Sequence, residues 1–259
     1  LCLILILPLE SLMIIENNMI AKKLAYQAYT DFISQQTSQK NNEFFERFYP
    51  ELVKELQTAS NDFKINIVRL IGPLVKAARE DAIQYFPSIV QIAFDLMKIR
   101  DPNIQAEAIR CYSLAISYVP IDGKIKEWCS QFCQAGIPLL VSTDLDEESL
   151  NHLYDAIHSL LCTLDKEVAP LVPQLLTKVI QDAQKGITIE QVNSFDMNDV
   201  YKNKSIYYRI QQTSDSPVKN YASMSEITEV RHALLILDAL IDSDPDFKNY
   251  IDNVYSICE

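Results

Sequence analysis

The sequence REDAIQYFPSIVQIAFDLM, residues 79–97, contains a pattern that returns elsewhere in the chain. Its centre, YFPSIV at residues 85–90, is matched by FYPELV at 48–53 and LVPQLL at 171–176, and by YIDNVY at 250–255 with Asp in place of Pro. We call this six-residue pattern the proline frame. Proline at the first position of a helix gives up an N–H that would be unpaired there, and apolar pairs follow it at helical spacing. The frame therefore predicts the start of a helix at each copy.

A longer amphipathic segment precedes each copy of the proline frame. These segments cover residues 17–36, 61–79, 148–164 and 228–242. In the second of them the apolar residues recur at intervals of three and four, which is the spacing of a helix and not of a strand. The predicted unit is therefore a helix, a short turn and a second helix.

The copies are spaced like the units of an α-solenoid. Pro50 and Pro87 are 37 residues apart, and Pro87 and Pro173 are 86 apart, close to two units. A period near 40 residues is typical of HEAT and armadillo repeats, which must stack to bury their apolar faces. We expect an all-α solenoid of about five HEAT-type hairpins, forming a right-handed superhelix with a concave binding surface.

The predicted division is one solenoid over residues 1–259. Its repeats cover residues 17–60, 61–100, 101–143, 144–184 and 224–259, and an insert covers 185–223. The insert lacks apolar periodicity, so we expect it to be partly disordered and cleaved by trypsin at Lys202 or Lys204; the alternative is an ordered flap held by its tyrosines. Within it, SIYYRIQ at 205–211 alternates like a short strand. In the third repeat, Gly136 and Pro138 predict that the second helix breaks or ends early.

Composition limits the partners. The chain has 259 residues, 48% of them hydrophobic and only four of them Gly, which favours a continuous helical core. Its formal charge of −12 argues against nucleic acid or an anionic membrane and favours a basic protein partner. The apolar segment at residues 1–15 is interrupted by Pro8 and Glu10, so we interpret it as a buried helix of a fragment cut from a longer chain, with no membrane insertion.

Nothing in the sequence indicates catalysis. It has no Walker loop, GxSxG elbow, HExxH or Rossmann glycine pattern, and we expect no catalytic residue, cofactor or metal. Cys129 with Cys133, and His158 with Cys162, have the i, i+4 spacing that could bring two metal ligands together on one helix face. Second ligand pairs at zinc spacing are missing, so we favour core packing for these residues, as for Trp128, and a reducing compartment.

Several of these stretches resemble the karyopherin-β (importin-β) nuclear transport receptors, most closely the karyopherin β3 subgroup. The stretches are residues 80–97, DKEVAPLVPQLLTKVIQDA at 165–183, DMND at 196–199 and EVRHALLILDALIDSDPDFKNYIDNVYSI at 229–257. In that subgroup, too, a repeat with a proline frame is followed by a long polar insert and then by a further repeat. This insert departs from the family: KNKSIYY at 202–208 is basic and has no Trp, where the subgroup's insert is acidic with a Trp.

The resemblance implies a non-catalytic nuclear import receptor, found in the cytoplasm, the nucleus and the nuclear pore. Its implied partners are basic cargo proteins carrying localisation signals, the Ran GTPase in its GTP form, and Phe-Gly nucleoporins. The alternative that the sequence leaves open is a HEAT-repeat scaffold of a phosphatase or kinase assembly. Irregular repeats and a long insert favour the receptor.

The resemblance also implies a cargo surface, because in that family the second helix of each repeat lines the concave face. Positions +1, +4, +5 and +8 from the frame's proline point away from the apolar stripe, and their carboxylates can accept charge-assisted hydrogen bonds from Lys or Arg. We expect cargo binding by Glu51, Glu55, Gln91, Asp95, Gln174, Lys178, Gln181 and the adjoining Asp182. The alternative is a solvated polar face without a partner.

Overall fold

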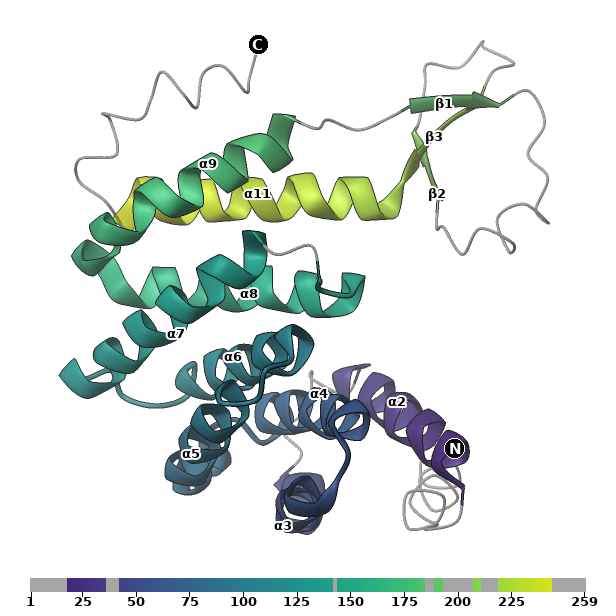
Figure 1. Ribbon diagram of the computed structural model, residues 1–259, viewed down its shortest axis with the longest axis vertical. Helices are drawn as coiled ribbons and strands as arrows, with labels where there is room; N and C mark the ends of the chain where they lie inside the picture. The colour runs from purple at the N-terminus through teal and green to yellow at the C-terminus, as the bar shows by residue number, and fades with distance from the viewer. Residues whose placement is uncertain are drawn as a thin grey trace.

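The chain is a stack of helices with a small sheet inserted between α9 and α11, the last two of its described helices (Figure 1). The computed structural model describes residues 18–35, 42–141, 144–184, 189–192, 207–210 and 219–243. The α-helices are α2 (Met19–Gln35), α3 (Asn42–Thr58), α4 (Asn61–Ala78), α5 (Phe86–Met97), α6 (Pro102–Ile116), α7 (Gly123–Val141), α8 (Glu147–Leu164), α9 (Val172–Gln184) and α11 (Met224–Ser243). Two 3₁₀ helices, η1 (Arg79–Tyr85) and η2 (Asp165–Leu171), lead into α5 and α9.

The helices pack as hairpins: α3 with α4, α5 with α6, α7 with α8, and α9 with α11. The turns inside the first three are short, which makes the paired helices antiparallel. Asp101 shows how the second helix of a hairpin is begun, because its side chain accepts hydrogen bonds from the backbone N–H groups of Asn103 and Ile104 at the start of α6. This pairing is shifted by one helix from the repeat boundaries expected above, so the proline frame opens a hairpin and does not close one.

Two of the described proline frames start helices as predicted, and one does not. Pro87 lies in the first turn of α5 and Pro173 in the first turn of α9. Pro50, however, lies inside α3, which begins eight residues earlier at Asn42. The helix extends backward because Phe45 and Tyr49 are buried and stack on each other, with ring centroids 4.8 Å apart.

The predicted break in the third repeat is also wrong, since α7 runs to Val141 with Pro138 inside it. Ile137 and Leu140 are buried on either side of Pro138, and their burial holds the last turn in place. Gly136 allows α7 to pack closely against α8 and α6. A Cβ at this position would lie 2.7 Å from Ile157 Cδ1 of α8 and 3.1 Å from Ile109 Cδ1 of α6.

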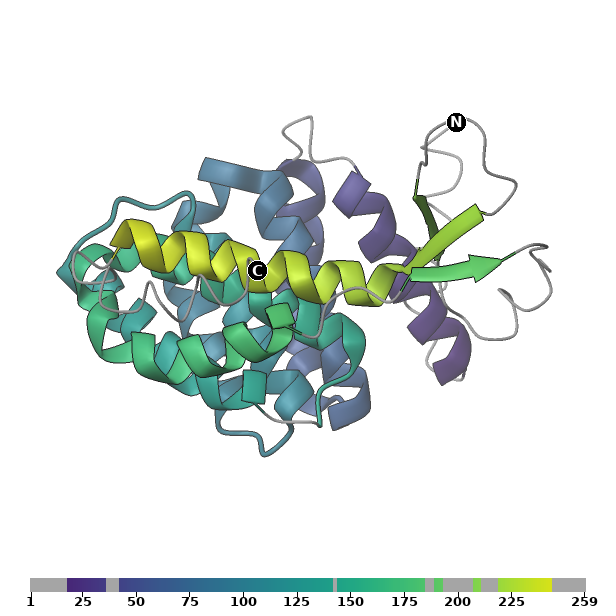
Figure 2. The ribbon, with the colours of Figure 1, turned by 90° about the horizontal axis from the view of Figure 1, so that it is seen from above.

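The described strands form one antiparallel sheet of order β1-β3-β2. The strands are β1 (Ile189–Val192), β2 (Tyr207–Ile210) and β3 (Lys219–Ser223), and β3 runs directly into α11. Figure 2 shows the sheet projecting beyond that end of α11. The strand predicted in SIYYRIQ is confirmed by β2. Lys202, Lys204, DMND, residues 1–17 and the fourth proline frame lie outside the described residues.

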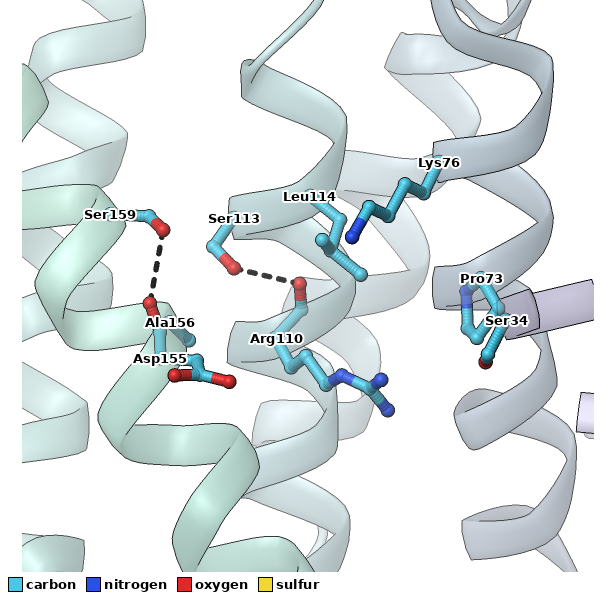
Figure 3. Close-up of a pocket in the computed structure, with 9 residues that line it drawn as sticks. All are labelled: Ser34, Pro73, Lys76, Arg110, Ser113, Leu114, Asp155, Ala156 and Ser159. Atoms are coloured by element: carbon cyan, nitrogen blue, oxygen red, sulfur yellow. Dashed lines mark hydrogen bonds between the residues drawn. The ribbon is translucent and has the colours of Figure 1, made fainter. Parts of the chain in front are cut away.

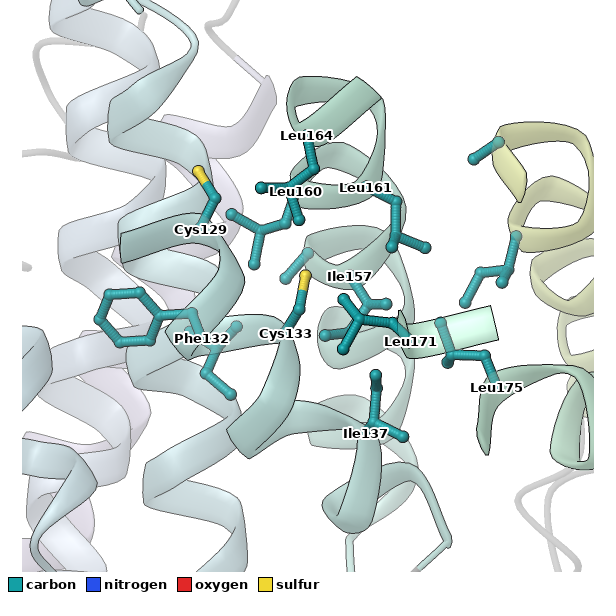
Figure 4. Close-up of a cluster of buried hydrophobic side chains, with 14 of the residues drawn as sticks. Cys129, Phe132, Cys133, Ile137, Ile157, Leu160, Leu161, Leu164, Leu171 and Leu175 are labelled. Carbon is teal, nitrogen blue, oxygen red and sulfur yellow. The ribbon is translucent and has the colours of Figure 1, made fainter. Parts of the chain in front are cut away.

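The core runs the length of the stack between the two rows of helices. In its C-terminal half, side chains of α7, α8, η2 and α9 interdigitate (Figure 4). Cys129 and Cys133 are fully buried here, as expected for core packing, and burial raises the pKa of both thiols. Trp128 packs beside them, against the rings of Phe86 and Phe94. Along the described part of the chain, no helix is both long and apolar enough to cross a bilayer.

Candidate functional site

Arg69 shows which row of helices lies on the inside of the curve. It projects from α4 and contacts Asp146, Glu148 and Ser149 at the start of α8, although α6 lies between these two helices. Packed helices are 8–10 Å apart, so one side chain can join α4 to α8 only if their ends converge. Convergence of this kind occurs on the concave side of a solenoid. The inner layer is therefore α2, α4, α6, α8 and α11, while α3, α5, α7 and α9 fan out on the other side (Figure 1).

A buried carboxylate holds the inner layer together. The side chain of Glu107, on α6, has no exposed surface, and its oxygens accept from Arg69 Nε at 2.8 Å and His152 Nδ1 at 2.8 Å. Because a carboxylate only accepts, Nδ1 of His152 carries the proton. Burial alone would raise the pKa of Glu107, but the hydrogen bond and charge of His152 and the charges of Arg110 and Arg69 outweigh it and hold the pKa below its usual value.

The inner layer is hollowed by two cavities that follow α4. The smaller, of about 70 Å³, is lined by Gln27, Thr30, Asp31, Asn66, Arg69 and Glu148. The larger, of about 190 Å³, is lined by Ser34, Pro73, Lys76, Arg110, Ser113, Leu114, Asp155, Ala156 and Ser159 (Figure 3). Each cavity takes residues from α2 on one side and α8 on the other. Both cavities lie along α4 between the same two helices, and we refer to them together as the groove.

The groove presents carboxylates to a ligand. Asp31 is exposed on α2 and, among the described residues, makes no ion pair. Asp155 is exposed on α8 and receives a hydrogen bond from Nε2 of the buried His232 on α11, at 3.2 Å. Burial would raise the pKa of Asp155, but the hydrogen bond and charge of His232 and the nearby cations lower it, so the group is ionised at neutral pH.

The sequence-predicted cargo residues lie on the outer layer. Glu51 and Glu55 are on α3, Gln91 and Asp95 on α5, and Gln174, Lys178, Gln181 and Asp182 on α9. Their expected place on the concave face was wrong, because the helices that follow the proline frame are the outer ones. The structure does not gather them, since α7 lies between α5 and α9 in the stack. Cargo binding by these residues stays a prediction.

Two of the predicted acidic residues have internal partners. Glu55 accepts hydrogen bonds from Lys22 and Tyr26, and so joins α3 to α2. Asp95 accepts from Gln91 on its own helix and pairs at 2.6 Å with Lys98, the residue that follows the helix. Glu51 is exposed and retains a carboxylate directed away from the core.

Sequence reasoning missed the groove residues, although one signal pointed to them. Arg69 interrupts the apolar INIVRLIGPLV and Glu107 interrupts IQAEAIRCY, 38 residues further on. A charge inside an apolar stripe at the repeat spacing indicates a paired charge on the inner layer.

The described residues contain no group of three or more His, Cys, Asp or Glu side chains placed to hold a metal ion.

The fold and groove define a HEAT-type α-solenoid whose concave face carries polar and charged side chains. Solved structures of the karyopherin Kap121p have this fold, and the predicted resemblance to karyopherin-β receptors is confirmed at that level. For Kap121p alone the TM-score is 0.64 at 16% identity, over 96% of this chain and 24% of Kap121p. For Kap121p bound to Pho4p the TM-score is 0.63 at 15% identity, with the same coverage of both chains.

A Kap121p variant with three acidic residues replaced by lysine gives a TM-score of 0.65 at 16% identity, over 96% of this chain and 24% of that one. The chain thus spans about a quarter of the length of Kap121p. No protein-family model and no curated protein sequence matches it.

Proposed function

We propose that this chain is a segment of a nuclear import receptor that binds a basic localisation signal of a cargo protein in the groove on its inner layer. The role is non-catalytic. The whole receptor would move between cytoplasm and nucleus through the nuclear pore and bind Phe-Gly nucleoporins. It would release its cargo when it binds GTP-bound Ran. The observation that carries the proposal is the pair of cavities along α4, which have carboxylates on both of their walls, α2 and α8.

The groove suits an extended basic segment for two physical reasons. Asp31 on α2 and Glu148 on α8 line the smaller cavity, so a basic side chain that enters it would meet a carboxylate from either wall. Charge-assisted hydrogen bonds of this kind are the stronger class of polar contact. The chain's formal charge of −12 adds a long-range attraction for basic partners.

Matched charge reversals on the two layers test where a cargo binds. The inner pair is Asp31→Lys with Asp155→Lys, and the outer pair, from the sequence-predicted surface, is Glu51→Lys with Asp95→Lys. We expect the inner pair to weaken binding of a fluorescent Lys-rich localisation peptide about tenfold at low salt, roughly 1.4 kcal/mol, and the outer pair to weaken it much less. Circular dichroism establishes that both variants keep their helix content.

The opposite ranking would move the cargo site to the outer layer, where the sequence-predicted residues lie. Equal binding by both variants and the wild type would contradict cargo recognition by this segment. Release of the peptide by GTP-loaded Ran, in the full-length receptor, separates a transport receptor from a constitutive scaffold, which should not respond.

A further inference from the structure

The two cavities of the groove differ in charge. Asp31 and Glu148 line the smaller one together with a single arginine, Arg69, whose nitrogens already contact Glu148, Asp146, Ser149 and the buried Glu107. Two carboxylates against one cation among its lining residues make this end negative. We call the smaller one the acidic cavity.

The larger cavity has the opposite sign. Lys76 of α4 and Arg110 of α6 both line it, and the one carboxylate there, Asp155, already accepts a hydrogen bond from His232. Lys76 is exposed and makes no ion pair with any residue that the structure describes. In Figure 3 the Lys76 amine and the Arg110 guanidinium both extend from their helices into the space that the labelled residues surround. We call the larger one the basic cavity.

The hydroxyls of the basic cavity are oriented by their own helices. Ser113 donates to the carbonyl of Arg110 at 2.9 Å, and Ser159 donates to the carbonyl of Asp155 at 3.0 Å. Both oxygens therefore present only lone pairs to the cavity, and can accept from the backbone N–H groups of a peptide. Lys76 and the remaining N–H groups of Arg110 are the donors, and a side-chain carboxylate is the acceptor that suits them.

The spacing of the two cavities fixes the spacing of the ligand's charges. On α4 the acidic cavity is lined by Asn66 and Arg69, and the basic cavity by Pro73 and Lys76, seven positions further along. Seven positions of helix rise about 10 Å. An extended peptide advances about 3.3 Å per residue, so the same distance is covered by about three residues.

We propose that the groove recognises a bipolar segment of the cargo, with a basic side chain in the acidic cavity and a Glu or Asp side chain three residues away in the basic cavity. This inference rests on the proposed function and narrows it, because a segment basic throughout would place a lysine beside Lys76. The acidic residue sets the register of the segment in the groove.

The test measures affinities of the whole chain for short labelled peptides by fluorescence anisotropy at low salt. The peptides share one basic residue and differ three positions away, carrying Glu, Gln or Lys. We expect the Glu peptide to bind about three- to fivefold more tightly than the Gln peptide, the range of a partly exposed ion pair, and the Lys peptide to bind most weakly. A Glu placed one residue from the basic position should give no advantage over Gln.

Charge reversal at Lys76 tests the receptor side of the same contact. Lys76→Glu should invert the order, so that the Lys peptide binds more tightly than the Glu peptide, whereas Lys54→Glu, the same change on the outer helix α3, should leave the order as in the wild type. Equal affinity for the Glu and Gln peptides, with binding retained, would overturn the bipolar inference and leave cargo binding intact. Failure of every peptide to bind would overturn both.

Discussion

Glu107 illustrates how a single side chain organises its surroundings. Its carboxylate is taken out of water entirely, and three basic side chains from α4, α6 and α8 converge on it. An isolated carboxylate could not be buried in this way without losing its charge, so the ion pairs are a condition of its burial. The same contacts orient His152 and also Arg110, which lines the groove. A structural charge in the core thereby shapes the polar face that a ligand would meet.

Replacing Glu107 by Gln should destabilise the chain by about 3 kcal/mol at pH 7, because the basic partners are left buried without their anion. The folded-state pKa of Glu107 lies below its usual 4.5, so its contribution is fully present above pH 4.5 and is lost as the pH falls through the folded pKa. The gap between wild type and variant should therefore narrow on acidification. Urea unfolding at pH 7 and pH 3.5 measures it, with Glu127→Gln on the exposed face of α7 as control. If the difference in unfolding free energy between wild type and Glu107→Gln stays constant with pH, the ionised carboxylate is not its source.

At the scale of single elements, helix starts were predictable where local chemistry alone decides them. Pro87 and Pro173 lie in the first turn of their helices because nothing upstream competes, since the seven residues before each helix form a 3₁₀ helix. Pro50 fails as a start because aromatic burial N-terminal to it outweighs the missing N–H. Tertiary packing of that kind is absent from a six-residue pattern. The same reason accounts for Pro138, which α7 passes without a break.

Two N-caps allow a direct comparison of local chemistry. Asp101 makes two side-chain hydrogen bonds to the first turn of α6, whereas Ser60, at the same position of α4, makes none. We expect Asp101→Ala to lower the free energy of unfolding by about 1 kcal/mol and Ser60→Ala to change it by a few tenths at most. Chemical denaturation followed by circular dichroism measures both. Equal effects would show that the cap contributes through something other than these hydrogen bonds.

Gly136 and Gly123 test the packing of α7 in the same way. Alanine at position 136 must displace the side-chain ends of Ile157, Ile109 and Leu153, so we expect a loss of about 1–2 kcal/mol despite its better helix propensity. A Cβ at position 123 meets nothing within 4 Å, and Gly123→Ala should be neutral or slightly stabilising. Thermal unfolding of the two variants gives the comparison. A stabilised Gly136→Ala would mean that α7 shifts away from α6 and α8 at little cost.

For the whole molecule, the sequence predicted the class of fold but not which helices form the inner layer. The period near 40 residues and the helical spacing of apolar residues were enough for a HEAT-type solenoid, which the likeness to Kap121p confirms. Which helix of each hairpin faces inward depends on contacts between repeats, such as that of Arg69 with residues 77 to 80 positions away. No short pattern contains this information. The predicted surface therefore fell on the outer layer, and the groove came from the structure.

Arg69 also predicts how the solenoid unfolds. Repeats in a solenoid normally contact only their immediate neighbours, which makes unfolding broad and weakly cooperative. Arg69 adds a bond that skips a repeat, from α4 to the start of α8, with 2.9 Å to Asp146 and 2.6 Å to Glu148. Loss of Arg69 also leaves the buried Glu107 with one partner fewer. We therefore expect α4, α6 and α8 to unfold as one unit in the wild type.

Arg69→Met keeps much of the side chain's apolar stem and removes its charge, so it should uncouple these three helices. The expected result is a lower urea midpoint together with a smaller m-value, because the transition spreads into steps that each expose less surface. Hydrogen exchange should show α4 and α8 opening at similar free energies in the wild type and at different ones in the variant. Arg100→Met, in the exposed turn between α5 and α6, should alter neither measurement. A lower midpoint with an unchanged m-value would mean that Arg69 stabilises the stack without joining its repeats, since cooperativity, and not stability alone, is what a contact across a repeat adds.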